Sequence, residues 1–228
     1  MWDRKELKAN ARHLLKANYW KAVIVGIILT FLYSSVEISS SNAARNSDLS
    51  DMIAALDNRS LLAVAAVIFG IIIIALVIDL LLTIFVWNPI EVGCQKFYVN
   101  CKEGNSKFGD IVYAFKNGYG HVGAVMFFRT LFTFLWSLLF IIPGIVKLYE
   151  YMMIPFILAD DPTISRKEAF ARSKAMMQGN KWNAFVLDLS FLGWLILACF
   201  TLGILNIFFV NPYMYLTHAE LYHSLKNN

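Results

Sequence analysis

Five charged residues lie within long apolar stretches of this chain, where an ionised side chain is costly and indicates either a packing interaction or a polar site. They are Asp79, Arg129, Lys147, Glu150 and Asp188. An arginine guanidinium stays protonated, and its planar fork can bind two carboxylates. Asp79, Arg129 and Asp188 therefore have the chemistry for a buried acid–arginine–acid cluster that would join helices or bind ions, protons or lipid headgroups.

The distances from the predicted membrane boundaries place these three residues at one level. Asp79 precedes Trp87 by eight residues, which is about 12 Å along a helix, and Arg129 lies at a similar depth. Asp188 follows Trp182 by six residues, about 9 Å. We predict one polar cluster here. Its role stays open: it could be an ion-pair cluster that fixes helix packing or a functional polar site. A third alternative is that the three side chains do not meet and each reaches the membrane boundary separately.

Lys147 and Glu150 form a second candidate pair. They are three residues apart, which puts them on one helix face. Pro143-Gly144 shortly before them predicts a sharp turn, because proline lacks a backbone donor and glycine permits unusual backbone angles. We therefore expect a local ion pair near the outer side of the membrane.

The helices that must position these residues are predicted from composition. The chain is 58% hydrophobic and 16% charged, with a mean hydropathy of +0.57, whereas soluble domains average about 45–50% apolar and ~25% charged residues. The run 61–87 is long enough to cross a hydrocarbon core of ~30 Å. The pattern predicts an all-α polytopic membrane protein rather than a soluble helical protein with a large core.

Six apolar segments alternate with polar connections, at 22–35, 61–87, 122–142, 145–159, 183–201 and 204–217. Of the twenty Lys and Arg residues, sixteen fall on the side of the termini, and only two fall in the predicted extracytoplasmic loop 36–60. This asymmetry predicts cytoplasmic N and C termini in a bacterial cell membrane. The first segment is expected to remain as a helix rather than be cleaved as a signal peptide.

Two similar stretches, "ANYWKA" and "GNKWNA", precede apolar segments at an offset of 162 residues. They align Asn18 with Asn180 and Trp20 with Trp182. Tryptophan favours the membrane interface because it combines an apolar body with a polar edge. We interpret each stretch as a corner where a surface helix turns into a membrane helix, with the asparagine bonding to backbone and the tryptophan anchoring the interface.

The sequences around these corners are also similar. "DRKE" at 3–6 and "SRKE" at 165–168 both have the pattern of a capping box. "IFVWNP" at 84–89 resembles "IFFVNP" at 207–212. We therefore predict a single membrane domain, 1–228, with an internal repeat of a basic amphipathic interfacial helix followed by a transmembrane hairpin, in units of about 3–90, 106–160 and 164–222.

Patterns typical of catalysis or cofactor binding are not found. The three cysteines lack zinc-site spacing, and His218-x-Glu220-x-x-His223 is not a zinc motif. There is no phosphate-binding glycine loop or nucleophile elbow. We expect no metal, no cofactor and no enzymatic activity. The net charge of +4 follows from membrane orientation and does not indicate nucleic acid as a partner.

The favoured hypothesis is a non-enzymatic structural or accessory protein that engages membrane lipids or partner proteins, with a homo-oligomer also open. The alternative is a small transporter or lipid-handling permease in which Asp79, Arg129 and Asp188 line the conduit. A cavity reaching their level would favour transport, whereas a fully paired node would favour a structural role.

Three stretches carry a family resemblance: "RKELKANARHLLKANYWKA", "FLWSLLFIIPGIVKLYEYMMIPFILADDP" and "GNKWNAFVLDLSFLGWLILACFTLGILNIFFVNPY". The chain, apart from 36–60, resembles an uncharacterised family of bacterial integral membrane proteins, common in Gram-positive bacteria and described as a domain of unknown function. It is more distantly similar to the membrane domain that precedes some glycerophosphodiester phosphodiesterases. The resemblance implies a membrane location and a helical architecture, and brings no activity or catalytic residues.

Overall fold

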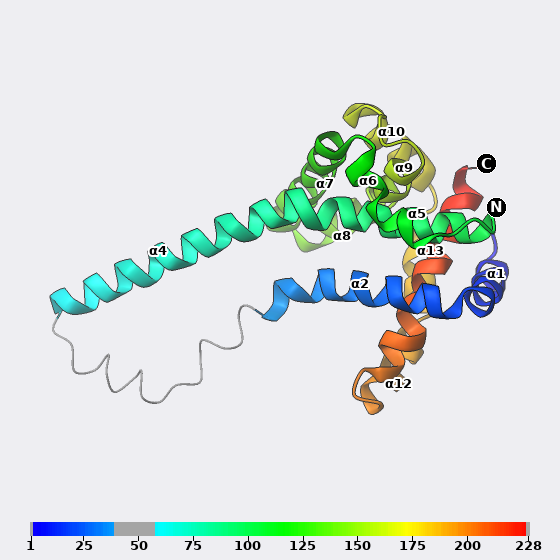
Figure 1. Cartoon of the computed structure of the whole chain (residues 1–228), viewed down its shortest axis with the longest axis horizontal. Helices are drawn as coiled ribbons and strands as arrows, with labels where there is room; N and C mark the ends of the chain where they lie inside the picture. Colours follow the sequence, from blue (N-terminus) through cyan, green and yellow to red (C-terminus); the bar gives the residue numbers. More distant parts are fainter. Residues whose placement is uncertain (1, 39–57, 227–228) are drawn as a thin grey trace.

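The computed structural model describes residues 2–38 and 58–226, and every regular element within these ranges is helical. The prediction of an all-α protein is confirmed for this part of the chain. Most of the predicted loop 36–60 lies outside the described residues. The elements (Figure 1) are α1 (Arg4–Ala17), α2 (Tyr19–Ile38), α4 (Asn58–Leu82), η1 (Thr83–Trp87), α5 (Asn88–Lys102), η2 (Phe108–Val112), α6 (Tyr113–Lys116), α7 (Tyr119–Leu139), α8 (Ile141–Glu150), α9 (Ile154–Asp160), α10 (Arg166–Met177), α11 (Lys181–Leu189), α12 (Leu192–Phe200), η3 (Asn206–Val210) and α13 (Asn211–Lys226).

Several of these helices are long and apolar enough to cross a membrane. By length and composition the described residues contain four, or five if the bent pair α1–α2 counts as one broken span. The sixth predicted segment, 204–217, falls in η3 and α13 and is not among them, so six crossings stay a prediction. The four are Ala65–Lys102, Tyr119–Leu139, Ile141–Asp160 and Lys181–Phe200.

The helix α4 extends away from the other helices (Figure 1). None of the side chains in its most apolar window is buried within the protein. It continues through η1 into α5 as one helix, and the part from Ala65 to Lys102 forms the candidate span. The sequence predicted that the second apolar segment, 61–87, ends before Asn88-Pro89, and that prediction is wrong, because the chain stays helical through the proline.

A π-helical turn explains how the helix passes Pro89. The turn η1 comes directly before Asn88, and in it a backbone N–H bonds to the carbonyl five residues earlier instead of four. This local change in hydrogen bonding lets the helix continue past Pro89, which has no backbone N–H to donate. Pro89 has no N–H for the carbonyl of Phe85, and the hydroxyl of Tyr119 donates to that oxygen instead, at 2.6 Å. The similar stretch at 207–212 also forms a π-helical turn, η3, directly before α13.

The hairpin between α7 and α8 turns at Phe140, not at Pro143-Gly144 as predicted. Phe140 is extended, with φ −156° and ψ 140°, and Pro143 and Gly144 lie in the first turns of α8, where proline is tolerated. Gly144 instead permits close packing, since a Cβ there would overlap the side chain of Ser137 on α7. Gly203, in the connection between α12 and η3, has φ 83°, a left-handed conformation that favours glycine.

The buried core surrounds α13, which contacts α1, α2, α5 and η3. Its aromatic and aliphatic side chains are almost fully buried and pack against the other elements, as Tyr213 does against Phe191 and Tyr215 against Tyr98. The apolar face of α1, formed by Leu7, Ala11 and Leu15, is also buried in this core. That face therefore packs on protein, and the interfacial position predicted for this helix stays a prediction.

The C-terminal part of α13 is held by a charged group on α9. Asp160 accepts hydrogen bonds from the hydroxyl of Tyr222 at 2.7 Å and from Nζ of Lys226 at 2.5 Å. Burial, together with the negative charge of Asp160, raises the pKa of Tyr222. The phenol therefore stays neutral and remains a donor, which fixes the end of α13 against α9.

Candidate functional site

Arg129, one of the predicted site residues, forms an ion pair in the structure. It lies on α7, and its Nη1 donates to Oε1 of Glu91 on α5 at 2.9 Å. The side chains are 24% and 12% exposed, so the pair is largely shielded. Arg129 thus binds a carboxylate as predicted, but the carboxylate belongs to a residue that the sequence analysis placed outside the spans.

Asp188 on α11 has two side-chain partners, a histidine and a tyrosine. Its Oδ1 lies 2.7 Å from Nε2 of His218 on α13, and its Oδ2 accepts from the hydroxyl of Tyr149 on α8 at 2.9 Å. The carboxylate therefore joins three helices that are far apart in sequence. Such a contact set fixes the relative positions of α8, α11 and α13.

A cavity of about 280 Å³ brings Arg129 and Asp188 together. Glu91, Gln95 and His218 also line it. Gln95 is 5% exposed, and its Oε1 accepts no hydrogen bond within the described chain. Because a buried polar atom normally has a partner, this oxygen offers an acceptor to a donor that enters the cavity.

A second cavity of about 340 Å³ also contains Glu91 and Arg129 in its lining. It is further lined by Thr130, Thr133 and Ser137 of α7, a spacing of three and four residues that keeps their side chains on one helix face. The hydroxyls of Thr133 and Ser137 donate to carbonyls four residues earlier. Polar groups thus continue from the ion pair along α7.

Asp79 does not join this cluster, so the three-residue site predicted from the sequence is corrected. Its side chain is exposed on α4, and no ion pair involves it within the described residues. The depth argument assumed that α4 packs against the other membrane helices, whereas α4 extends away from them (Figure 1). Glu91, three turns further along the same continuous helix, supplies the carboxylate instead.

Lys147 and Glu150 pair across 2.7 Å, as their spacing predicts. Glu150 also accepts from Nζ of Lys181 at 2.5 Å, and Lys181 is next to Trp182. The pair therefore lies beside the second corner, and its expected position near the outer side stays a prediction. Glu150 is 4% exposed, so one shielded carboxylate is shared by two ammonium groups.

The two corners have matching hydrogen bonds. Nδ2 of Asn18 donates to the carbonyl of Leu14 at 3.5 Å, and Nδ2 of Asn180 donates to the carbonyl of Met176 at 3.0 Å. Each bond reaches four residues back to the end of the preceding helix. The predicted backbone contacts are therefore present, and at the first corner the axes of α1 and α2 differ by 106°.

Burial also matches between the corners. Trp20 is 69% exposed and Trp182 is 71% exposed, while Ala22 and Ala184 are both almost fully buried. Asp3 and Ser165 cap the two surface helices through their side chains. Both tryptophans thus point away from the protein, as interface anchors would, and their common membrane level stays a prediction.

Glu91, Gln95 and His218 were missed in the sequence analysis. Glu91 and Gln95 follow Asn88-Pro89, where the sequence predicted a helix end, so they were assigned to a surface stretch. Their spacing of four residues on one helix face was the available signal. His218 was considered only as a metal ligand with His223, and nothing in its local sequence indicated Asp188 as its partner.

The comparisons with known proteins identify the family. Curated proteins and solved structures gave no match. A family model described as "Protein of unknown function (DUF975)" matches residues 111–228, just over half of the chain. The matched region contains Arg129, Asp188 and His218, which line the 280 Å³ cavity, although Glu91 and Gln95 lie before it. The protein therefore belongs to the DUF975 family of proteins of unknown function.

Proposed function

We propose that the protein is a non-enzymatic accessory protein of the bacterial cytoplasmic membrane, with cytoplasmic termini, that engages a partner membrane protein through α4. The observation that supports this most directly is the exposure of α4 over its most apolar window together with the exposed carboxylate of Asp79. An ionised aspartate near the centre of a membrane helix costs about 2.5–3.5 kcal/mol. A cation on a partner helix would remove that cost.

The charges of the described chain favour a different protein over a second copy. Arg129 and Lys147 are the cations that fall within the predicted apolar segments, and both already have carboxylate partners within the chain. A second copy would therefore offer Asp79 no free cation at its own depth. The partner that fits is a membrane protein whose span carries an arginine or lysine.

The proposal includes an internal repeat in which a surface helix is followed by a membrane hairpin. The repeat units are about 3–90, 106–160 and 164–222. Matching caps, asparagine contacts and tryptophan exposure at the two corners support it. In each unit the basic surface helix would face the cytoplasm and the lipid headgroups. Six crossings would follow from three hairpins.

Site-specific photo-crosslinking on α4 in intact membranes tests the partner. A crosslinker at Leu76 lies on the face of Asp79, whereas one at Val77 lies on the opposite face. We expect a protein adduct from Leu76, several-fold less from Val77, and loss of the Leu76 adduct in Asp79→Asn. No protein adduct at either position would show that lipid alone surrounds α4, and an adduct to a second copy would contradict the choice of partner.

A second candidate function is a small permease, and the cavity between Arg129 and Asp188 favours it. The unpaired acceptor of Gln95 and the polar face of α7 would then be parts of a pathway. For protons, we expect liposomes containing the protein to acidify under an imposed potential faster than protein-free liposomes, as followed with an internal pH dye. Arg129→Gln should reduce that flux at least tenfold. Equal rates with and without protein would reject proton conduction.

A further inference from the structure

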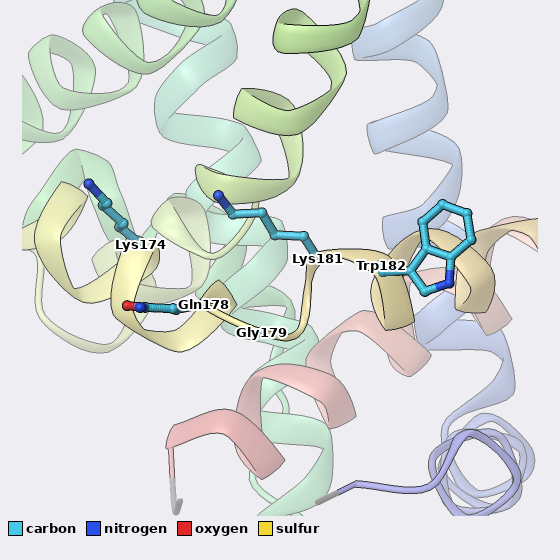
Figure 2. Close-up of a pocket in the computed structure, with 5 residues that line it drawn as sticks. All are labelled: Lys174, Gln178, Gly179, Lys181 and Trp182. Atoms are coloured by element: carbon cyan, nitrogen blue, oxygen red, sulfur yellow. The ribbon is translucent and has the colours of Figure 1, made fainter.

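Two cavities meet at the second corner, between α8, α10 and α11. The first, of about 400 Å³, is lined by Lys174, Gln178, Gly179, Lys181 and Trp182. Figure 2 shows Lys174 and Lys181 extending on the same side of the connection between α10 and α11, with the ring of Trp182 beyond them. A basic cavity here lies beside a residue that is 71% exposed and typical of the membrane interface.

The second cavity, of about 370 Å³, shares Lys181 and Trp182 with the first. The rest of its lining is almost entirely apolar and comes from α8 and α11, namely Ile142, Ile145, Val146, Tyr149 and Phe185. From Tyr149 back to Ile142 the cavity follows α8 for about 10 Å. A basic cavity thus continues into an apolar groove that lies along a candidate membrane span.

The net charge of the side chains at this corner is positive. Glu150 is shared by Lys147 and Lys181, which leaves one positive charge in excess. Lys174 is exposed and adds a second positive charge at the first cavity. Asp188 on α11 lines the separate cavity with His218 and does not line either of these two.

The backbone adds to this potential. Gly179 has φ +76°, a left-handed conformation that favours glycine and lets the chain turn sharply from α10 into α11. The nine-residue helix α11 begins at Lys181, and no side chain caps its N-terminus. The free N–H groups of a helix N-terminus attract anions. They lie beside the two lysines of the first cavity.

We propose that these two cavities form a binding site for one anionic phospholipid. The phosphate binds between Lys174, Lys181 and the N-terminus of α11, and an acyl chain lies in the groove along α8. Trp182 contacts both parts at the glycerol level. A free phosphate would use only the basic cavity, whereas the continuous apolar groove matches a lipid. The site uses no residue of α4 and is therefore independent of the proposed partner protein.

Native mass spectrometry of the full-length protein in detergent tests the site. The probes are phosphatidylglycerol and, as the neutral comparison, phosphatidylcholine of the same acyl chains. We expect tighter binding of phosphatidylglycerol, and about tenfold weaker binding in Lys174→Gln, consistent with loss of one charged hydrogen bond of about 1.5 kcal/mol. Lys167→Gln is the matched control, because Lys167 is exposed on the same helix and lines neither cavity.

A second variant tests the groove. Ile145 is 48% exposed, so Ile145→Trp is expected to fold while its larger side chain fills the groove and displaces the acyl chain. We expect it to weaken phosphatidylglycerol binding while leaving the thermal midpoint unchanged. Equal binding of the two lipids, equal effects of Lys174→Gln and Lys167→Gln, or full displacement by millimolar inorganic phosphate with no effect of Ile145→Trp would each overturn the proposal.

Discussion

Replacing Gly93 with alanine is expected to prevent the folded protein from accumulating in the membrane. Gly93 lies on α5, where η2 crosses so closely that a Cβ would overlap the carbonyl oxygen of Ile111 and lie 2.9 Å from that of Asp110. The obstacles are backbone atoms, which cannot move aside by changing rotamer. Because overpacking costs about 1–3 kcal/mol even where side chains relax, we expect a larger loss of unfolding free energy here.

Gly70→Ala is the matched control for this change. Gly70 is in the exposed helix α4, and a Cβ there meets no atom within 4 Å. Alanine is also the better helix former by about 1 kcal/mol, so this variant should accumulate and melt like the natural protein or slightly higher. The readouts are the yield in membranes and the thermal midpoint in detergent. If Gly93→Ala matched Gly70→Ala, the close crossing of α5 and η2 would be wrong.

The second large effect is expected from Glu150→Gln. Glu150 is 4% exposed and is the only carboxylate that pairs with Lys147 or Lys181 within the described residues. Its neutralisation leaves two shielded ammonium groups without a counter-charge, and breaking a buried pair in this way costs about 3–5 kcal/mol. We expect the thermal midpoint in detergent to fall by 10 °C or more, which corresponds to such a loss in a chain of this size.

An exposed pair on α10 provides the comparison. Glu168 and Arg172 lie 2.6 Å apart, but their side chains are about half exposed. Surface pairs contribute about 0–1 kcal/mol, so Glu168→Gln should shift the midpoint by 2 °C or less. A similar shift in both variants would show that Glu150 is less shielded than its burial indicates. A double variant, Glu150→Gln with Lys181→Gln, should recover part of the loss.

Local features were predictable from the sequence because they depend on few residues. The capping of α1 and α10 follows from Asp3 and Ser165, and the bends follow from Asn18 and Asn180, whose side chains reach backbone only four residues away. Contacts of this kind are determined within one helical turn. They therefore leave a pattern in the sequence that a reader can recognise without knowing the tertiary structure.

The partners of the charges in the apolar segments were not predictable in the same way. Arg129 pairs with Glu91 across 38 residues and Asp188 with His218 across 30, and these pairings depend on how the helices pack. The prediction that the apolar segment ends before Asn88-Pro89 had a second effect. It placed Glu91 outside the predicted membrane helices, so Glu91 was not considered as a partner of Arg129. A π-helical turn has no simple sequence signature, so the continuation into α5 could not be anticipated.

The continuous helix from Ala65 to Lys102 has a mechanical consequence. Its 38 residues extend about 57 Å, nearly twice the ~30 Å that a bilayer core requires. Membrane helices respond to bilayer thickness by tilting, and among the described residues none packs over the most apolar part of α4 to resist this. Tyr119 and Gly123 of α7 contact η1, so α4 would tilt about these contacts. In the proposed membrane orientation, a change in membrane thickness would tilt α4 and load α5, which carries the buried Tyr98 into the core around α13.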